Sequence, residues 1–184
     1  MLVQLIAHTA EPERTVAAAA KLCYSDAHIE TLLDGLTPEK TAAFLQKLSD
    51  LGHASPIEHA SFTFGIEGVS RAFLAQVTRH RIASFSVQSQ RYVRLEDFRY
   101  VIPPEIEAVP EAKARFVAAM NADAEKYLEL ARTLEDAHTR TLMAQGLPEK
   151  AARAKAAKQA NEDARFVLPN ACETKMVMTM NCRS

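Results

Sequence analysis

Two long helical patterns occupy much of the second half of this 184-residue chain. Pro110 opens the first pattern, which continues to about Gly146, and the second begins at Pro148 and reaches Leu168. Proline suits the first turn of a helix and glycine suits its end, so this punctuation predicts two separate helices. Alanine, the best helix former, is also abundant. Helices are therefore expected to outnumber strands, and the Ala/Lys-rich run at residues 150–158 is interpreted as a solvated helix face.

Helix-start signals mark three further segments in the first half of the chain. Residues 12–23 carry a proline in their first turn and then a run of alanines. A second helix is expected to begin at Thr37, where a capping threonine is followed by proline and an acid, and to stop at Gly52. Ser70 is positioned to cap a third helix over residues 71–79, whose apolar residues have helical spacing.

Alternation of apolar and polar residues predicts the strands. Residues 61–67 and 171–180 alternate in this way. Residues 1–7 are apolar on both faces, which predicts a strand that is covered on both sides. Residues 52–56 are expected to form a loop, and the Ser/Gln-rich residues 82–92 a loop with irregular strand.

The composition restricts the class of protein. A length of 184 residues with 48% hydrophobic residues is enough for one domain with a sizeable core. The net charge of −1 gives no reason to expect binding to nucleic acid or to an anionic membrane. No apolar run approaches the ~20 residues that span a bilayer. The odd number of cysteines (Cys23, Cys172 and Cys182) argues against a disulfide framework and favours a cytoplasmic location.

The residues that indicate chemistry lie in one short segment. It contains Arg79, His80, Arg81 and Arg91, and between them stand neutral hydrogen-bonding side chains: Ser84, Ser86, Gln88, Ser89 and Gln90. Arginine forks suit phosphate oxygens, and serine and glutamine suit the edge of a heterocycle. A nucleoside monophosphate satisfies both demands. The same arginines also suit surface ion pairs, and the residues alone leave both interpretations open.

The order and spacing of several motifs resemble those of flavin-dependent thymidylate synthases. The signature of that family is an Arg-His-Arg triplet followed, after seven residues, by a serine. The matching motifs in this chain are Arg79-His80-Arg81 with Ser89, then Ser89-Gln90-Arg91-Tyr92, Gly52-His53-x-Ser55-Pro56-x-Glu58-His59, Ala19-Ala20-Lys21-Leu22-Cys23-Tyr24, Ala164-Arg165-Phe166-Val167-Leu168-Pro169 and Asn181-x-Arg183-Ser184.

The resemblance implies a fold and an activity. The fold is α+β, with a central, mostly antiparallel sheet flanked by long helices, in a homotetramer whose active sites combine several subunits. The activity is the reductive methylation of dUMP to dTMP. Methylenetetrahydrofolate donates the carbon, and FAD, reduced by NADPH, carries the hydride.

The resemblance also implies roles for particular residues. Arg79 and Ser89 are the catalytic candidates, with Ser89 interpreted as a hydrogen-bonding contact because no His or Lys base is adjacent to it. The implied dUMP contacts are Gln76, Arg79, Gln88, Ser89, Gln90, Arg91 and Arg165. The implied FAD contacts are His53, Ser55, Glu58, Arg79, His80, Arg81, Asn181 and Arg183.

Two departures from the family pattern leave an alternative open. Val87 stands where family members often have glutamate, and the family continues past the Asn-x-Arg-Ser motif with which this sequence ends at Ser184. Residues 1–184 are therefore expected to form a single domain that lacks the family's C-terminal segment. The alternative is a nucleotide- or flavin-binding module without catalysis.

Two further interpretations carry less weight. Cys172 and Cys182 invite comparison with the cysteine nucleophile of flavin-free thymidylate synthases, but the surrounding motifs of that family are absent, so they are interpreted as buried or strand cysteines. His53, Glu58 and His59 offer metal-binding side chains without the HExxH spacing of a metalloprotease, so no metal site is expected.

Overall fold

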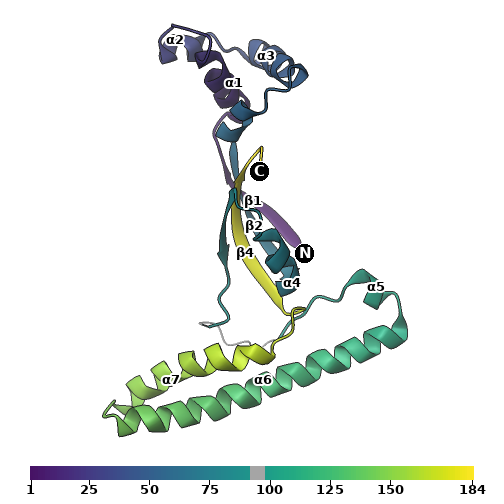
Figure 1. Ribbon diagram of the computed structural model, residues 1–184, viewed down its shortest axis with the longest axis vertical. Helices are drawn as coiled ribbons and strands as arrows, with labels where there is room; N and C mark the ends of the chain where they lie inside the picture. The colour runs from purple at the N-terminus through teal and green to yellow at the C-terminus, as the bar shows by residue number, and fades with distance from the viewer. Residues whose placement is uncertain (92–97) are drawn as a thin grey trace. The chain divides into compact units, whose positions relative to one another are not determined.

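The computed structural model describes residues 1–91 and 98–184, which fall into two compact units (Figure 1). Unit 1 comprises Met1–Glu67, Val77–Ser86 and Met176–Ser184, and unit 2 comprises Gly68–Gln76 and Val87–Lys175. The prediction that the chain forms one domain stays a prediction.

Within the described residues, the strands form one four-stranded sheet in the order β1-β2-β4-β3. The strands are β1 (Leu2–His8), β2 (Ser61–Ser70), β3 (Ala83–Val87) and β4 (Glu173–Asn181). Strands β1 and β2 are antiparallel, with Leu2 opposite Glu67 and His8 opposite Phe62. The hydroxyls of Thr63 and Thr179 lie 2.9 Å apart between β2 and β4. The α+β class with an antiparallel sheet is confirmed.

Unit 1 carries a group of short helices, and their ends follow the punctuation of the sequence (Figure 1). They are α1 (Pro12–Leu22), α2 (Ile29–Asp34), α3 (Pro38–Asp50) and the 3-10 helix η1 (Ser55–His59). The hydroxyl of Thr37 accepts a hydrogen bond of 3.4 Å from the backbone N–H of Lys40, as its capping role predicts. Gly52, with a φ of 69°, ends the turn after α3 in the left-handed region that favours glycine.

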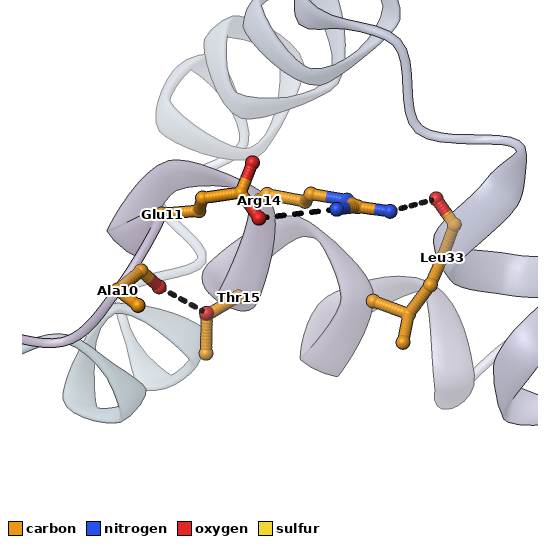
Figure 2. Close-up of polar contacts among 5 residues, drawn as sticks. All are labelled: Ala10, Glu11, Arg14, Thr15 and Leu33. Carbon is orange, nitrogen blue, oxygen red and sulfur yellow. Dashed lines mark hydrogen bonds and ion pairs between the residues drawn. The ribbon is translucent and has the colours of Figure 1, made fainter.

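Arg14 connects α1 to α2 (Figure 2). Its Nη1 donates to Glu11 Oε2 over 3.1 Å, and its Nη2 donates to the carbonyl of Leu33 over 2.9 Å. That carbonyl belongs to the last turn of α2, where a cation is favourable to the helix dipole. On the same helix, Thr15 Oγ1 donates to the carbonyl of Ala10 over 3.2 Å, which secures the start of α1 (Figure 2).

Two long helices dominate unit 2 and lie side by side (Figure 1). They are α6 (Pro110–Ala144) and α7 (Glu149–Ala164); the unit also contains α4 (Arg71–Val77), α5 (Pro104–Glu107) and the 3-10 helix η2 (Arg165–Val167). The buried residues of α7 include alanines at every fourth position: Ala152, Ala156, Ala160 and Ala164. Small side chains let two helix backbones approach closely. Ala156 packs with Ala152 and with Leu142 of α6, while Ala164 packs with Tyr127.

Several element boundaries and two burial predictions differ from expectation. The run at residues 150–158, interpreted as a solvated helix face, includes the fully buried Ala152 and Ala156, which face α6. Helix α4 ends at Val77 rather than Arg79, because the His80 N–H bonds to the Val77 carbonyl (3.2 Å) and closes a turn. Helix α7 ends at Ala164 rather than Leu168: residues 165–167 form the 3-10 helix η2, and Leu168 is extended, as favoured for a residue before proline. Residue 55 begins η1 instead of continuing a loop.

The burial of β1 and the regularity of β3 also differ from the predictions. Every residue of β1 is exposed, Ile6 by 55%, so the prediction of cover on both faces is wrong for this edge strand. Strand β3 is regular where irregular strand was expected. Its alternation of half-buried Phe85 with exposed Ser84 and Ser86 is a strand pattern with small polar residues on the outer face. Tyr92, also part of that prediction, lies outside the described residues.

None of the helices in the described part of the chain combines the length and the apolar character needed to cross a membrane.

Candidate functional site

The polar loop after β3 in unit 2 is closed by its own side chains. The backbone N–H of Gln88 donates to the carbonyl of Lys175 in β4 over 3.0 Å, which anchors the start of the loop. Ser89 Oγ then accepts a hydrogen bond of 3.2 Å from the backbone N–H of Arg91. A serine hydroxyl that bonds to the backbone two residues ahead stabilises a turn. The turn fixes the path of the chain into Arg91.

Glu162, in the last turn of α7, contacts two arginines of unit 2. Its Oε1 lies 3.2 Å from Nη1 of Arg91, and both side chains are about half exposed, at 46% and 45%. Its backbone carbonyl accepts a hydrogen bond of 3.1 Å from Nε of Arg165. Glu162 therefore gathers the guanidinium groups of Arg91 and Arg165 at the end of α7, the first through its carboxylate and the second through its main-chain carbonyl. Guanidinium groups suit an anionic ligand.

Gln90 contacts a buried thiol. Its Nε2 donates to Cys172 Sγ over 3.5 Å, and Cys172 is only 1% exposed. Burial raises the pKa of the Cys172 thiol, although the hydrogen bond from Gln90 opposes the shift. The reactive form of cysteine is the thiolate, and the burial of Cys172 disfavours that form. Its interpretation as a buried cysteine is confirmed, whereas Cys182 is exposed and follows β4.

The Asn-x-Arg-Ser motif in unit 1 forms a compact turn. Asn181 Oδ1 accepts hydrogen bonds from the Arg183 backbone N–H over 2.9 Å and from Ser184 Oγ over 3.1 Å. Ser184 Oγ also lies 2.6 Å from the carbonyl of Ile82, the residue that follows Arg81. The motif is thereby placed next to the end of the Arg-His-Arg triplet.

Arg183 joins this turn to η1 through an ion pair between its Nη1 and Glu58 Oε1. Two elements far apart in sequence thus meet in unit 1, and both carry residues of the predicted flavin set. The exposed members of that set, which lie where a ligand can reach them, are His53, Ser55, Glu58, Arg79, His80, Arg81 and Arg183. Asn181 is half-buried beneath its own turn.

A cavity of about 490 Å³ opens beside η1 in unit 1. His53 and Cys182 lie on its wall, and most of the remaining lining is apolar: Pro12, Val16, Leu45, Leu48, Ala54, Ile57, Ala60 and Phe62. The His53 backbone N–H is bound to the Leu48 carbonyl over 2.9 Å, so the end of α3 positions this histidine. Apolar walls with a few polar groups are typical of sites for flat organic rings.

Comparisons with known proteins connect these two sets of residues to one family. The model of the Thy1 family, described as thymidylate synthase complementing protein, matches residues 4–184. The chain belongs to this family. A flavin-dependent thymidylate synthase of Clostridium tetani is 48% identical over 182 residues, which cover 99% of this chain and 70% of the relative. The proteins of the same name from Geobacter sulfurreducens and Halobacterium salinarum are 45% and 35% identical, over 69% and 79% of their lengths and 100% of this chain.

The structure of this Thy1 member divides the predicted site residues between its two units. The predicted nucleotide contacts Ser89, Arg91 and Arg165 are linked to one another through the turn and Glu162 in unit 2. Gln76 is also in unit 2, exposed in the last turn of α4. The predicted flavin contacts are all in unit 1, where Arg79, assigned to both ligands, also lies. The individual roles of these residues stay predictions.

Sequence reasoning missed Glu162. Its position three residues before Arg165, in the last turn of a predicted helix, is visible in the sequence, and residues at this spacing share a helix face. Its contact with Arg91 joins residues 71 positions apart, and no pattern in the sequence indicates it. Over the part of the chain that the structure describes, no three His, Cys, Asp or Glu side chains are grouped as metal ligands.

Proposed function

We propose that this protein catalyses the reductive methylation of dUMP to dTMP, the reaction that the name of its relatives indicates. The observation that carries the proposal is the cluster in unit 2 where Glu162 gathers Arg91 and Arg165 beside the turn of Ser89. Two guanidinium groups beside a loop of neutral donors suit the phosphate and the uracil edge of one nucleotide.

The phosphate is the part of dUMP that these arginines would bind. Arginine donates pairs of hydrogen bonds to phosphate oxygens and stays charged at any physiological pH. Hydrogen bonds to charged groups contribute about 1.5–3 kcal/mol each. Gln88, Ser89 and Gln90 would then supply donors and acceptors to the heterocycle. Ser89 serves in binding rather than as a nucleophile, because its hydroxyl accepts a hydrogen bond from the Arg91 N–H and no His or Lys base is adjacent to it within the loop up to Arg91.

The residues of unit 1 fit FAD by the chemistry of their side chains. Arg79, Arg81 and Arg183 carry the positive charge that a pyrophosphate requires, and His53 lies on an apolar cavity wall of the kind that a flat ring requires. His80, Ser55, Glu58 and Asn181 add polar groups to the same unit. When bound, FAD reduced by NADPH supplies the hydride, and methylenetetrahydrofolate supplies the carbon.

Arg79 is the proposed catalytic residue beside Ser89, because the resemblance places it at the flavin and near the nucleotide. There its guanidinium would help to orient dUMP against the reduced flavin. The chain's task is otherwise to bind and orient its ligands and to exclude water. We further propose a homotetramer as the active assembly.

The test is direct detection of dTMP. The purified protein is incubated with FAD, NADPH, methylenetetrahydrofolate and dUMP that carries tritium at the reacting carbon, and both tritium release and dTMP are measured. Formation of dTMP at a rate that depends on added flavin supports the proposal. Tight binding of FAD and dUMP without any dTMP would instead identify the alternative, a nucleotide- or flavin-binding module without catalysis.

A further inference from the structure

Glu162, which pairs with Arg91, lies at an electrostatically unfavourable position on α7. The last turn of this helix contains Glu162 and Asp163 and no basic residue. A carboxylate at a helix C-terminus is destabilising because the partial charge of the helix end is also negative. The local helix therefore gives no reason for an acid at position 162, and the compensation comes from Arg91 of the loop and from Arg165 beyond the helix.

Glu162 contacts the two arginines through different groups, its carboxylate and its main-chain carbonyl. The carboxylate of Glu162 is 3.2 Å from Nη1 of Arg91, and its main-chain carbonyl accepts the 3.1 Å bond from Nε of Arg165. Because Arg165 is bonded to the main chain, replacing the Glu162 side chain removes the contact with Arg91 and leaves the bond to Arg165 in place. The two arginines can therefore be separated experimentally.

We propose that Glu162 is a positioning residue for the nucleotide phosphate: its carboxylate holds the Arg91 side chain ready to bind dUMP. This inference rests on the function proposed above. A long side chain that is free in solution loses conformational entropy when it binds a ligand, and a side chain that is already held loses less. The neighbouring turn has the same effect on the main chain, since Ser89 Oγ bonds to the backbone N–H of Arg91.

The first experiment compares Glu162→Gln with the wild-type protein. Glutamine keeps the size and an acceptor oxygen but removes the charge that attracts Arg91. Dissociation constants for dUMP are measured by calorimetry, and those for deoxyuridine, which lacks the phosphate, by displacement. We expect the constant for dUMP to rise by about three- to tenfold, the range for one immobilised side chain. The constant for deoxyuridine and the kcat at saturating dUMP should stay unchanged.

Glu149→Gln is the matched control. Glu149 lies on the same helix and forms an exposed ion pair of the same kind, 3.1 Å from Nε of Arg153, at the opposite end of α7. Its replacement should leave both dissociation constants unchanged. An equal loss of dUMP affinity in the two variants would overturn the proposal, since it would trace the effect to the charge of the helix rather than to Arg91.

A double-mutant cycle tests whether Glu162 acts through Arg91. Arg91→Ala should weaken dUMP binding by about tenfold or more, the loss of one charge-assisted contact. Adding Glu162→Gln to that variant should cause no further loss of dUMP affinity.

A full additional loss in the double variant overturns the positioning role. Unchanged or tighter dUMP binding by Glu162→Gln alone overturns it as well. Absence of dUMP binding by the wild-type protein would overturn the proposed function as well, so the two failures are distinguishable.

Discussion

Ser89 illustrates how one hydroxyl serves both the loop and its proposed ligand. Its Oγ accepts a hydrogen bond from the backbone N–H of Arg91 over 3.2 Å, so removing it loosens the turn that carries the arginine. We predict that Ser89→Ala lowers kcat/KM for dUMP about tenfold, the effect of one lost hydrogen bond, without abolishing turnover. Steady-state kinetics measure the loss.

Ser25→Ala provides the control for Ser89. Ser25 Oγ accepts a hydrogen bond of 3.2 Å from the backbone N–H of Ala27 in unit 1, the same kind of turn contact, and its replacement should leave kcat/KM unchanged. Complete loss of turnover in Ser89→Ala, together with a covalent nucleotide adduct on Ser89 in mass spectra taken during turnover, would show that the serine attacks the substrate and that the binding role is wrong.

Cys172 makes the stability of the fold depend on pH. Its thiol is buried and its pKa is raised above the ordinary thiol value of 9.0 by that burial. Below pH 9.0 the thiol is protonated in both the folded and the unfolded chain, so this stabilisation is fully present. As the pH rises above that value, the unfolded chain loses its proton first and the free energy of unfolding falls, until the folded pKa is passed. We predict this decline in urea titrations of the wild-type protein.

In Cys172→Ala, the free energy of unfolding should no longer fall with pH through this thiol. The small cavity left by the substitution should lower stability at every pH. Cys182→Ala is the control, because Cys182 is exposed and its replacement should retain the decline. Parallel pH profiles for the wild-type protein and Cys172→Ala would contradict the assignment of the effect to this thiol.

At the scale of elements, the packing of α7 against α6 depends on its alanines. Ala156 is 0% exposed and packs with Leu142 of α6 and with Ala152. A larger side chain at this position must force the two helices apart or adopt a strained rotamer. Ala156→Leu should therefore lower the free energy of unfolding by about 1–3 kcal/mol. Urea unfolding followed by circular dichroism measures the change.

Ala154→Leu is the matched substitution on the exposed face of the same helix. Leucine and alanine have similar helix propensity, so this variant should unfold within about 0.5 kcal/mol of the wild-type protein. Equal destabilisation by both substitutions would indicate that the alanine-bearing face is not the packed one.

The elements that the sequence predicted well are those with strong local punctuation. Helix α3 has its Thr37 cap and Gly52 at its end, and the boundary between α6 and α7 is marked by Gly146 and Pro148. Local chemistry determines such ends. The burial of β1 was predicted wrongly because composition tells how apolar a strand is and does not tell what covers it.

The candidate site was predictable to the extent that its residues form motifs. Ser89 and Arg91 follow the Arg-His-Arg triplet at a fixed spacing, so both were found without a structure. The contact of Arg91 with Glu162 joins residues 71 positions apart, so it depends on how the chain folds as a whole. A contact of this kind has no periodicity to reveal it.

At the scale of the whole molecule, the candidate site residues fall into two groups, one in each unit. Unit 1 holds the Arg-His-Arg triplet, the Asn-x-Arg-Ser turn and the apolar cavity beside His53. Unit 2 holds the turn of Ser89 and the arginines gathered by Glu162. The proposed function assigns FAD to the first set and the dUMP phosphate to the second, with Arg79 assigned to both. Each ligand should therefore stabilise a different part of the chain.

We predict that hydrogen exchange separates the two ligands. A ligand that binds only the closed form of a segment slows its exchange in proportion to occupancy, by up to about 100-fold at a ligand concentration of about 100 times Kd. With dUMP alone, amides in residues 88–91 and 162–165 should be protected; with FAD alone, those in residues 53–58 and 181–183. Peptides from the middle of α6 and from α2 serve as internal controls and should not respond locally to either ligand.

Mass spectrometry of the digested protein measures all of these segments at once. Protection of residues 53–58 by dUMP, with residues 88–91 unaffected, would place the nucleotide in unit 1 and contradict the assignment of Arg91 and Arg165 to its phosphate.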